Sequence, residues 1–221
     1  PTSSGEFWRQ LISPQVLSTI WISLQTSLCV VGLTFLFGFP VAYLLGSRDF
    51  RGKVVLDTLL EMPLVLPPLV SGVAILILLN GNGLMGTLLA RADIHLIFTK
   101  KGIILAQFFV ASPFFIKTVR ESIAAIPQNL LAASATLTAS RFYTFRKLVF
   151  PLSTSGILAG LAMTWTRALG EFGATSMVAG CIPMRTETMT VSIYLQAMGG
   201  ELPAASAIAL ILTIFAFTML I

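Results

Sequence analysis

The sequence predicts an all-α membrane protein, a polytopic helical bundle built as a single domain. Of its 221 residues, 56% are hydrophobic and only 10% are charged, whereas soluble domains carry about 25% charged residues. The apolar residues form long continuous runs, unlike the alternating pattern of a membrane β-barrel. Because the bilayer interior offers the backbone no water, such runs must form helices that satisfy their own hydrogen bonds.

Five apolar runs are each expected to cross the membrane, since about 20 apolar residues span the hydrocarbon core. Their approximate limits are Val16–Leu45, Leu59–Leu79, Ile103–Val119, Leu148–Leu169 and Ala204 to the end of the sequence. The third run is short, so the flanking Lys117 is expected to extend its ammonium group to the interface. Two further apolar stretches, Phe172–Met184 and Thr188–Gly200, are too short to cross alone and are expected to be helix extensions or re-entrant segments.

The ends of the sequence and its prolines add two expectations. The sequence begins with Pro1 and ends inside an apolar run at Ile221, so we expect a fragment, with room for one further N-terminal helix. Pro40 predicts a kink about one turn earlier in the first span. The prolines of the segment Met62–Leu69 must free backbone carbonyl groups, and two explanations stay open: a cavity satisfies these groups, or the prolines merely kink the helix for packing.

The basic residues indicate how the chain is oriented in the membrane. The segments after the first and third spans hold eight: Arg48, Arg51, Lys53, Lys117, Arg120, Arg141, Arg146 and Lys147. The opposite side holds six: Arg9, Arg91, Lys100, Lys101, Arg167 and Arg185. This small excess favours a cytoplasmic location for the first set and an outside N-terminus. Because the basic residues alternate with apolar spans and do not share one solvated face, the net charge of +5 does not indicate binding of nucleic acid.

The sequence contains no candidate for catalysis or metal binding. It has no GxxxxGK[ST] phosphate-binding loop and no HExxH motif, and its single histidine, His95, has no second ligand nearby. Cys29 and Cys181 are far apart in sequence, so neither a disulfide framework nor a metal site follows. We therefore expect no enzymatic activity and no metal or cofactor on this chain.

Two segments stand out for function. Arg167 and Glu171 are four residues apart at the end of the fourth span and can pair on one helical turn; an ionisable pair at membrane depth indicates function, although a pair that only fixes helix packing is the alternative. The segment QNLLAASATLTASRFY, at Gln128–Tyr143, is rich in small residues and follows Pro127. It is expected to be a short surface helix. Composition alone favours a helix that lies on the lipid surface without a functional contact.

At these residues the sequence resembles the permease subunits of ATP-binding-cassette importers for molybdate, tungstate and sulfate, with the molybdate and tungstate branch as the best match. The stretches that carry the resemblance are EMPLVLPPLVSGVAILIL at Glu61–Leu78, RFYTFRKLVFPLSTSGILAG at Arg141–Gly160, RALGEFGAT at Arg167–Thr175 and RTETMTVSIYLQ at Arg185–Gln196. With the spacing of the spans, the resemblance covers nearly the whole chain.

The resemblance implies one permease domain over residues 1–221, with a cytoplasmic coupling segment at about residues 128–147 that docks on a separate ATPase. Counted back from Pro151, the Glu-Ala-Ala signature of the family falls on Ala132, Ala133 and Ser134, with Thr138 at its glycine position. The chain thus departs from the signature at the glutamate and the glycine. The coupling residues that the resemblance implies are Asn129, Ala132, Ala133, Ser134, Thr138, Ala139, Arg141 and Phe142.

The resemblance also implies the partners. Two permeases pair around a central pathway in the plasma or inner membrane, two ATPase subunits supply the sites for ATP and magnesium, and an external binding protein delivers the oxyanion. We expect the pathway to be lined by Ser71, Thr164, Arg167 and Glu171, because small hydroxyls suit an anion in transit. Two alternatives stay open: an importer for sulfate or another anion, and a gradient-driven secondary transporter with Glu171 as its proton site, although no internal repeat typical of that class is found.

Overall fold

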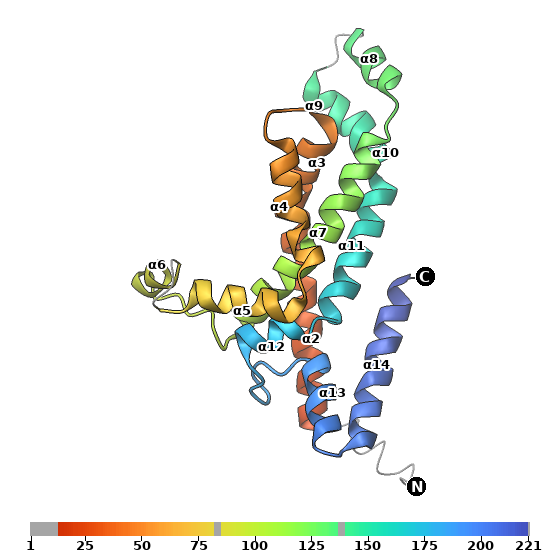
Figure 1. The fold of residues 1–221 in the computed structure, drawn as a ribbon. Helices are drawn as coiled ribbons and strands as arrows, with labels where there is room; N and C mark the ends of the chain where they lie inside the picture. Colours follow the sequence, from red (N-terminus) through yellow and green to blue (C-terminus); the bar gives the residue numbers. More distant parts are fainter. Residues whose placement is uncertain (1–12, 82–84, 137–139, 221) are drawn as a thin grey trace.

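The computed structural model describes residues 13–81, 85–136 and 140–220, and all regular elements in these ranges are helices (Figure 1). Most of them run along the length of an elongated molecule. The helices α5 and α6 project to one side, and the helices α8 and α9 form one end. The all-α prediction is confirmed.

The first predicted span is a single apolar helix of 34 residues, Pro14–Ser47. It consists of α2 (Pro14–Leu33), a π-helical turn η1 (Thr34–Gly38) and α3 (Phe39–Ser47). The helix begins at Ser13, whose hydroxyl accepts a hydrogen bond from the Val16 N–H at 3.3 Å. The irregularity that Pro40 predicts takes the form of the π-helical turn, because a proline cannot donate to the carbonyl group four residues earlier.

The second predicted span, Leu59–Leu79, is not one continuous helix but a pair of helices with a sharp break between them. The helix α4 (Lys53–Val65) ends at Leu66, and α5 (Pro68–Leu79) leaves it at an angle of 114°. The cause is local: Pro67 and Pro68 have no N–H to donate, and a residue before proline is driven into extended backbone. Leu66 and Pro67 accordingly have ψ angles of 134° and 133°. The break is much larger than a packing kink.

The third predicted span is confirmed within α7 (Lys100–Ala124), a continuous helix of 25 residues. Thr99 begins it by accepting a hydrogen bond from the Gly102 N–H at 3.3 Å. Between α5 and α7 the chain also forms the short helix α6 (Gly86–Arg91). The helix α7 is central, since α2, α3, α4, α5, α11 and α12 all pack against it.

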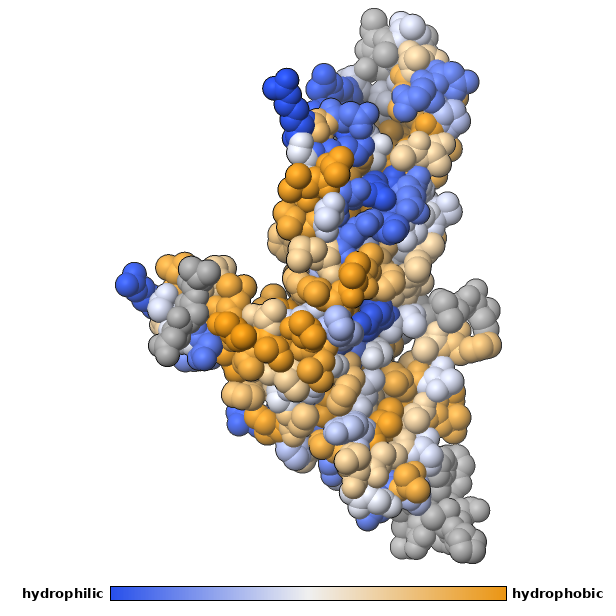
Figure 2. Space-filling view, in the orientation of Figure 1, coloured by the Kyte–Doolittle hydropathy of each residue, from blue (hydrophilic) through white to orange (hydrophobic). Residues whose placement is uncertain are grey.

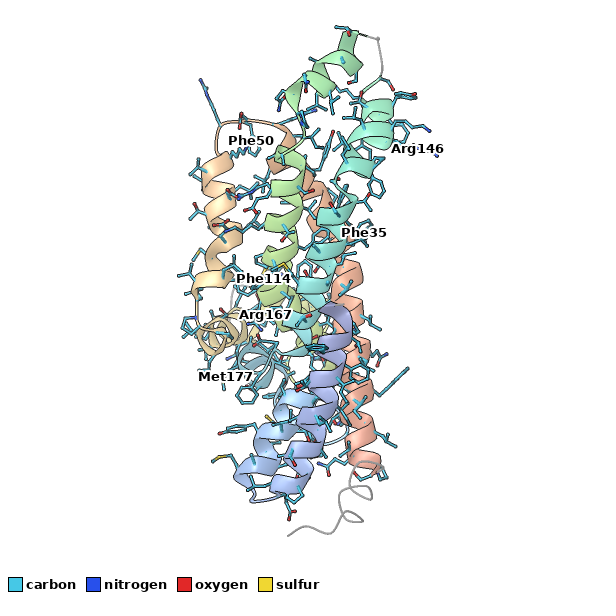
Figure 3. The ribbon with its side chains drawn as sticks, turned by 90° about the vertical axis from the view of Figure 1, so that its right-hand side faces the viewer. Phe35, Phe50, Phe114, Arg146, Arg167 and Met177 are labelled. Carbon is cyan, nitrogen blue, oxygen red and sulfur yellow. The ribbon has the colours of Figure 1, made fainter. Side chains whose placement is uncertain are left out.

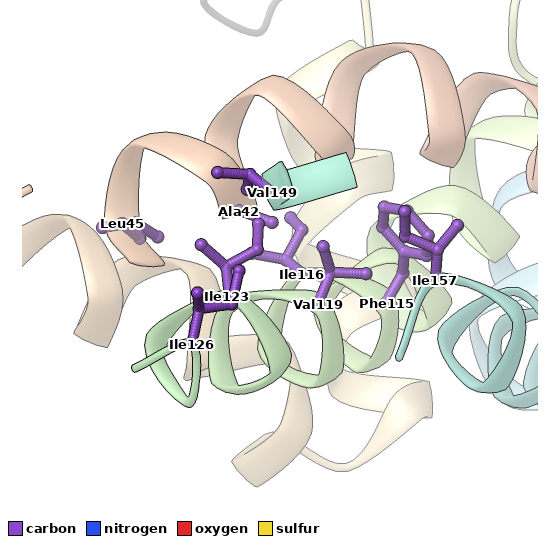
Figure 4. Close-up of a cluster of buried hydrophobic side chains, with 9 residues drawn as sticks. All are labelled: Ala42, Leu45, Phe115, Ile116, Val119, Ile123, Ile126, Val149 and Ile157. Carbon is purple, nitrogen blue, oxygen red and sulfur yellow. The ribbon is translucent and has the colours of Figure 1, made fainter. Parts of the chain in front are cut away.

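The largest cluster of buried apolar side chains joins α7 to its neighbours (Figure 4). Its members are Ala42, Leu45, Phe115, Ile116, Val119, Ile123, Ile126, Val149 and Ile157. Gly46 lets the backbones of α3 and α7 approach closely in this cluster. A Cβ atom at this position would lie only 2.9 Å from the Arg120 carbonyl oxygen, so a larger residue would not fit without a shift. Such close contacts stabilise helix pairs in membranes.

The predicted surface helix over Gln128–Tyr143 is divided, which corrects the expectation of one helix. The helix α8 is described over Gln128–Thr136. Ser140 has extended backbone, and a new helix begins after it, with the Ser140 hydroxyl accepting a hydrogen bond from the Tyr143 N–H at 3.2 Å. This second helix comprises α9 (Arg141–Thr144), the π-helical turn η2 (Phe145–Val149) and α10 (Phe150–Leu152). It leads directly into α11 (Thr154–Leu169) with a bend of 62°. The fourth predicted span is therefore bent near Ser153.

The last part of the chain contains α12 (Gly173–Ala179), α13 (Met189–Met198) and α14 (Leu202–Leu220). The helices α12 and α13 lie within the two apolar stretches, Phe172–Met184 and Thr188–Gly200, that are too short to cross the membrane alone. The helix α14 packs on α13 and α11, and its apolar part, Leu202–Thr218, has only 17 residues.

The described residues contain two helices long and apolar enough to cross a membrane, or four if each bent pair is one span. The expected five spans are reached only when α14 is added.

Candidate functional site

The predicted Arg167–Glu171 ion pair is present where the chain turns from α11 into α12. Arg167 Nη1 lies 2.7 Å from Glu171 Oε2. The Glu171 side chain is only 1% exposed, whereas that of Arg167 is 25% exposed. Figure 3 labels Arg167 at the end of α11, at a level just below Phe114 of α7. The carboxylate is therefore buried, and the guanidinium keeps partial access to the surface.

Glu171 also connects three helices. Its Oε1 atom accepts a hydrogen bond from the Ala174 N–H at 2.8 Å, in the first turn of α12. Its carbonyl oxygen accepts a hydrogen bond from the Thr190 hydroxyl of α13 at 2.7 Å. A negative charge at a helix N-terminus is favourable, so Glu171 stabilises α12 as well as neutralising Arg167. The arrangement thus supports the packing role that the sequence left open.

Beside this pair, α5 and α12 cross with little space between their backbones. A Cβ atom at Gly72 would lie 2.7 Å from the Ala174 Cα, and one at Gly173 would lie 2.8 Å from the Leu69 nitrogen. Ser71 lies next to this contact and is buried, and its Oγ atom has no hydrogen-bond partner among the described residues.

Thr164, the remaining residue of the predicted pathway, is also buried. Its hydroxyl points toward the Ala111 carbonyl oxygen of α7, at 3.5 Å. In this conformation Ser71 and Thr164 do not reach an open surface, and a role for them in a pathway stays a prediction.

A row of small polar side chains on α2 escaped the sequence analysis. Thr19, Ser23, Thr26 and Ser27 of α2 are all buried, and so is Thr34 at the start of the adjoining η1. Ser23 accepts a hydrogen bond from the Met189 N–H at the start of α13, and Ser27 accepts one from the Trp165 indole of α11, each at 2.8 Å. Hydroxyls of this kind hold membrane helices together. Their spacing of three and four residues, at Ser23, Thr26 and Ser27, is the signal that could have revealed this face.

A second group that the sequence analysis missed joins α4 to α7. We call it the α4–α7 network, and its members are Asp57 and Glu61 of α4 and Lys117, Arg120 and Glu121 of α7. Arg120 pairs with Asp57, and its Nη2 atom lies 3.8 Å from both Glu61 Oε1 and Glu121 Oε1. Lys117 Nζ lies 3.5 Å from the same Glu61 oxygen. The sequence showed the spacings, with two acids four residues apart and two bases three residues apart, but not that the two helices pack together.

The predicted coupling residues lie at one end of the molecule, on two different helices. Asn129, Ala132, Ala133 and Ser134 belong to α8, whereas Arg141 and Phe142 belong to α9; Thr138 and Ala139 lie outside the described residues. A hydrogen bond of 3.2 Å from the Thr144 hydroxyl to the Ser134 hydroxyl connects the two helices.

The same end carries an exposed apolar surface. Ala132 and Ala133 are exposed, and so are Leu130, Phe142 and Tyr143. An open groove of about 610 Å³ lies between α8 and α9, lined by Leu130, Ala133, Ser134, Ser140, Tyr143, Thr144, Lys147 and Leu148. An apolar surface of this kind is suited to docking another protein.

Among the described residues, no group of three or more His, Cys, Asp or Glu side chains is placed to hold a metal ion. Cys29 and Cys181 are free thiols.

Comparison with known proteins identifies the family. Residues 38–221 match the family model described as "Binding-protein-dependent transport system inner membrane component". The chain is 38% identical over 208 residues to the probable transport system permease protein NifC of Clostridium pasteurianum, covering 93% of this chain and 72% of that protein. It is 34% identical over 207 residues to the sulfate transport system permease protein CysT of Salmonella typhimurium, covering 94% and 75%. It is also 40% identical over 176 residues to a probable molybdenum ABC transporter permease of Haloferax volcanii, covering 80% and 62%.

Solved structures agree on the fold. A bacterial alginate ABC transporter, crystallised with an alginate-bound periplasmic protein, matches with a TM-score of 0.76 at 16% identity, over 99% of this chain and 80% of that one. The MetNI methionine ABC transporter in an inward-facing conformation matches with a TM-score of 0.74 at 15% identity, over 99% and 94%. Because the family model covers most of the sequence, the chain belongs to the family of binding-protein-dependent transport system inner membrane components and is a transport permease subunit.

Proposed function

We propose that this permease forms the translocation pathway of an ATP-driven importer for a tetrahedral oxyanion, with molybdate or tungstate ahead of sulfate. The observation that carries the proposal is the identity of 34% to 40% to permeases named for sulfate and for molybdenum, over 80% or more of the chain. Sulfate, molybdate and tungstate share one shape and charge, so one type of pathway can serve all of them. The external binding protein then determines which of these anions is delivered.

The proposed assembly consists of two copies of this chain, two ATPase subunits and an external oxyanion-binding protein. The exposed surface of α8 and α9 docks on the ATPase, which alone binds ATP and magnesium. ATP-driven closure of the ATPases moves α8 and α9 and changes which side of the pathway is open. The free energy for this change comes from the difference in ligand affinity between the two conformations of the complex.

The contacts of Glu171 favour this function over a secondary transporter with a proton site there. One carboxylate oxygen is paired with Arg167 and the other accepts the Ala174 N–H. These contacts give Glu171 a role in helix packing, so its burial is explained without a role in carrying protons. The departures from the Glu-Ala-Ala signature, at Ala132 and Thr138, are compatible with docking through the exposed apolar side chains instead of through a glutamate.

The test is purification and reconstitution of the complex. The chain, co-expressed with its proposed ATPase partner, should purify as a complex. In proteoliposomes supplied with the binding protein, it should take up molybdate, tungstate or sulfate only when ATP is present. The matched control is an ATPase without its phosphate-loop lysine, which should assemble but not transport. Uptake that follows an imposed proton gradient without ATP would exclude the proposal.

A further inference from the structure

The α4–α7 network is unusual because its charged side chains are only partly buried between two packed helices, in the last third of α7. Glu61 is 37% exposed, Lys117 is 46% exposed and Glu121 is 61% exposed. These residues lie at the predicted cytoplasmic end of the third span, and charged groups there face water or another protein and not lipid tails, since exposure to hydrocarbon costs several kcal/mol. Figure 2 shows a hydrophilic patch on the face of the molecule where α4 and α7 lie, with apolar side chains below it. This face is therefore expected to be in contact with water.

The network lies between the Arg167–Glu171 pair and the end formed by α8 and α9. The helices α7 and α11 pack antiparallel, as shown by the Thr164 contact with Ala111 and by Thr118, whose hydroxyl lies 3.7 Å from the Met163 sulfur. Lys117 is six residues beyond Ala111 on α7, and Arg167 is three residues beyond Thr164 on α11. At 1.5 Å per residue, Lys117 and Arg167 are roughly 13 Å apart along the helix axes.

The two cations of the network are held differently. Arg120 pairs with Asp57 and also lies near Glu61 and Glu121, and only 19% of its side chain is exposed. Lys117 has Glu61 as its ion-pair partner, at 3.5 Å, and Glu61 also faces Arg120. A lysine ammonium has three donors on a flexible stem, so Lys117 can leave Glu61 for another anion while Arg120 continues to neutralise Glu61.

We propose that Lys117 contacts the transported oxyanion in the part of the pathway between the Arg167–Glu171 pair and α8, with Glu61 as its competing partner. This inference rests on the proposed function and adds to it one specific residue that contacts the anion. Competition by Glu61 keeps the contact weak, and weak binding is what conduction requires, because an anion held by an unpaired cation is released slowly. Asp57 and Arg120 hold α4 and α7 together and do not contact the anion.

The first experiment measures uptake by the reconstituted complex. Lys117→Gln should lower oxyanion uptake about tenfold, the effect of one charge-assisted hydrogen bond. Lys117→Arg should recover part of the uptake. The matched control is Lys53→Gln, which removes the same charge from the same helix pair but breaks only the exposed pair with Asp49, and it should transport normally. Equal uptake by Lys117→Gln and Lys53→Gln would overturn the proposal.

The second experiment does not depend on transport. In a chain whose cysteines are both replaced by serine, Lys117→Cys should react with an anionic methanethiosulfonate reagent in inside-out vesicles, and molybdate or tungstate should slow the reaction. Leu59→Cys, an exposed apolar position on α4, should not react. If Lys117→Cys does not assemble, Glu121→Cys is the replacement, and it should react in the same way.

The outcomes separate the two proposals. No reaction at position 117 or 121 would show that this face is in lipid or covered by protein, and would overturn the inference. A reaction that molybdate, tungstate and sulfate all leave unchanged would show water without anion contact, and would also overturn it. If the wild-type complex takes up no oxyanion while the Lys117→Cys variant still reacts, the proposed function is rejected and the α4–α7 face is confirmed to be in water.

Discussion

Glu171 holds Arg167 with one carboxylate oxygen and the N-terminus of α12 with the other. One buried side chain therefore determines both the charge balance at the end of α11 and the position of the helix that packs against α5. Its role in packing is visible in the structure, whereas a contact of Arg167 with a transported anion remains a prediction.

Replacing Arg167 alone and replacing Glu171 alone should have different effects on stability. Arg167→Ala leaves a buried carboxylate without its cation and should destabilise the complex by on the order of 3 kcal/mol. Glu171→Gln keeps an acceptor for the Ala174 N–H and leaves a partly exposed guanidinium, so its effect on the melting temperature in detergent should be smaller. Transport should slow in both.

The double variant Arg167→Ala with Glu171→Gln should recover part of the stability lost in Arg167→Ala, because neither charge is then left alone. Strictly additive losses in melting temperature and in uptake would mean that the two residues do not interact.

The crossing of α5 and α12 should not tolerate a larger residue at Gly72. In Gly72→Ala the new methyl group would lie 2.7 Å from the Ala174 Cα, so one helix must move, at a cost of about 1–3 kcal/mol. Gly32→Ala is the control, because nothing lies within 4 Å of its Cβ position in α2; it should leave stability unchanged or raise it by up to about 1 kcal/mol. Thermal unfolding of the two variants side by side provides the comparison, and equal melting temperatures would contradict the close contact.

The hydrogen bond from the Met189 N–H to Ser23 should contribute measurably to stability. Ser23→Ala leaves a buried N–H at the start of α13 without its acceptor, which costs about 1–3 kcal/mol. Thr213→Ala is the control, since the Thr213 hydroxyl is exposed and donates only to Ala209 of its own helix, and this variant should unfold like the wild type. If Ser23→Ala also unfolds like the wild type, α13 is not held by this bond.

Coupling to the ATPase should depend on the small residues of α8. Ala133→Arg places a long charged side chain on the exposed face of α8 and beside the groove against α9, and should abolish transport and transport-stimulated ATP hydrolysis. Membrane insertion should be intact. Ala92→Arg, which adds the same charge at an exposed position after α6, should leave coupling unchanged. Normal coupled hydrolysis in Ala133→Arg would mean that the ATPase docks elsewhere.

The orientation in the membrane can be tested at two exposed positions. In a background without Cys29 and Cys181, a cysteine at His95 should react with an impermeant reagent added outside intact cells. A cysteine at Asp49 should react only after permeabilisation, because the excess of basic residues places its loop in the cytoplasm. The opposite labelling pattern would show that the N-terminus of this chain is inside.

The sequence by itself was sufficient for the fold class, the two continuous spans and the Arg167–Glu171 pair. These depend on composition, on apolar runs and on a spacing of four residues, all of which are local properties. It was not sufficient for the shape of the second and fourth spans, because an apolar run gives the length of a helix and not the angle at a break. The prolines at positions 67 and 68 marked where a break could occur, but the angle of 114° depends on the packing of α5 against α12.

Only the tertiary structure brought together residues that are far apart in sequence. The pairing of Asp57 with Arg120 and of Ser23 with Met189 joins helices that fold side by side, and no local pattern fixes which faces of two apolar helices meet. The burial of Glu171 and the partial exposure of Lys117 were likewise decided by packing. In a membrane the energetic consequence of a charged residue depends on what its side chain faces, and that is determined by the assembled helices and not by the sequence position alone.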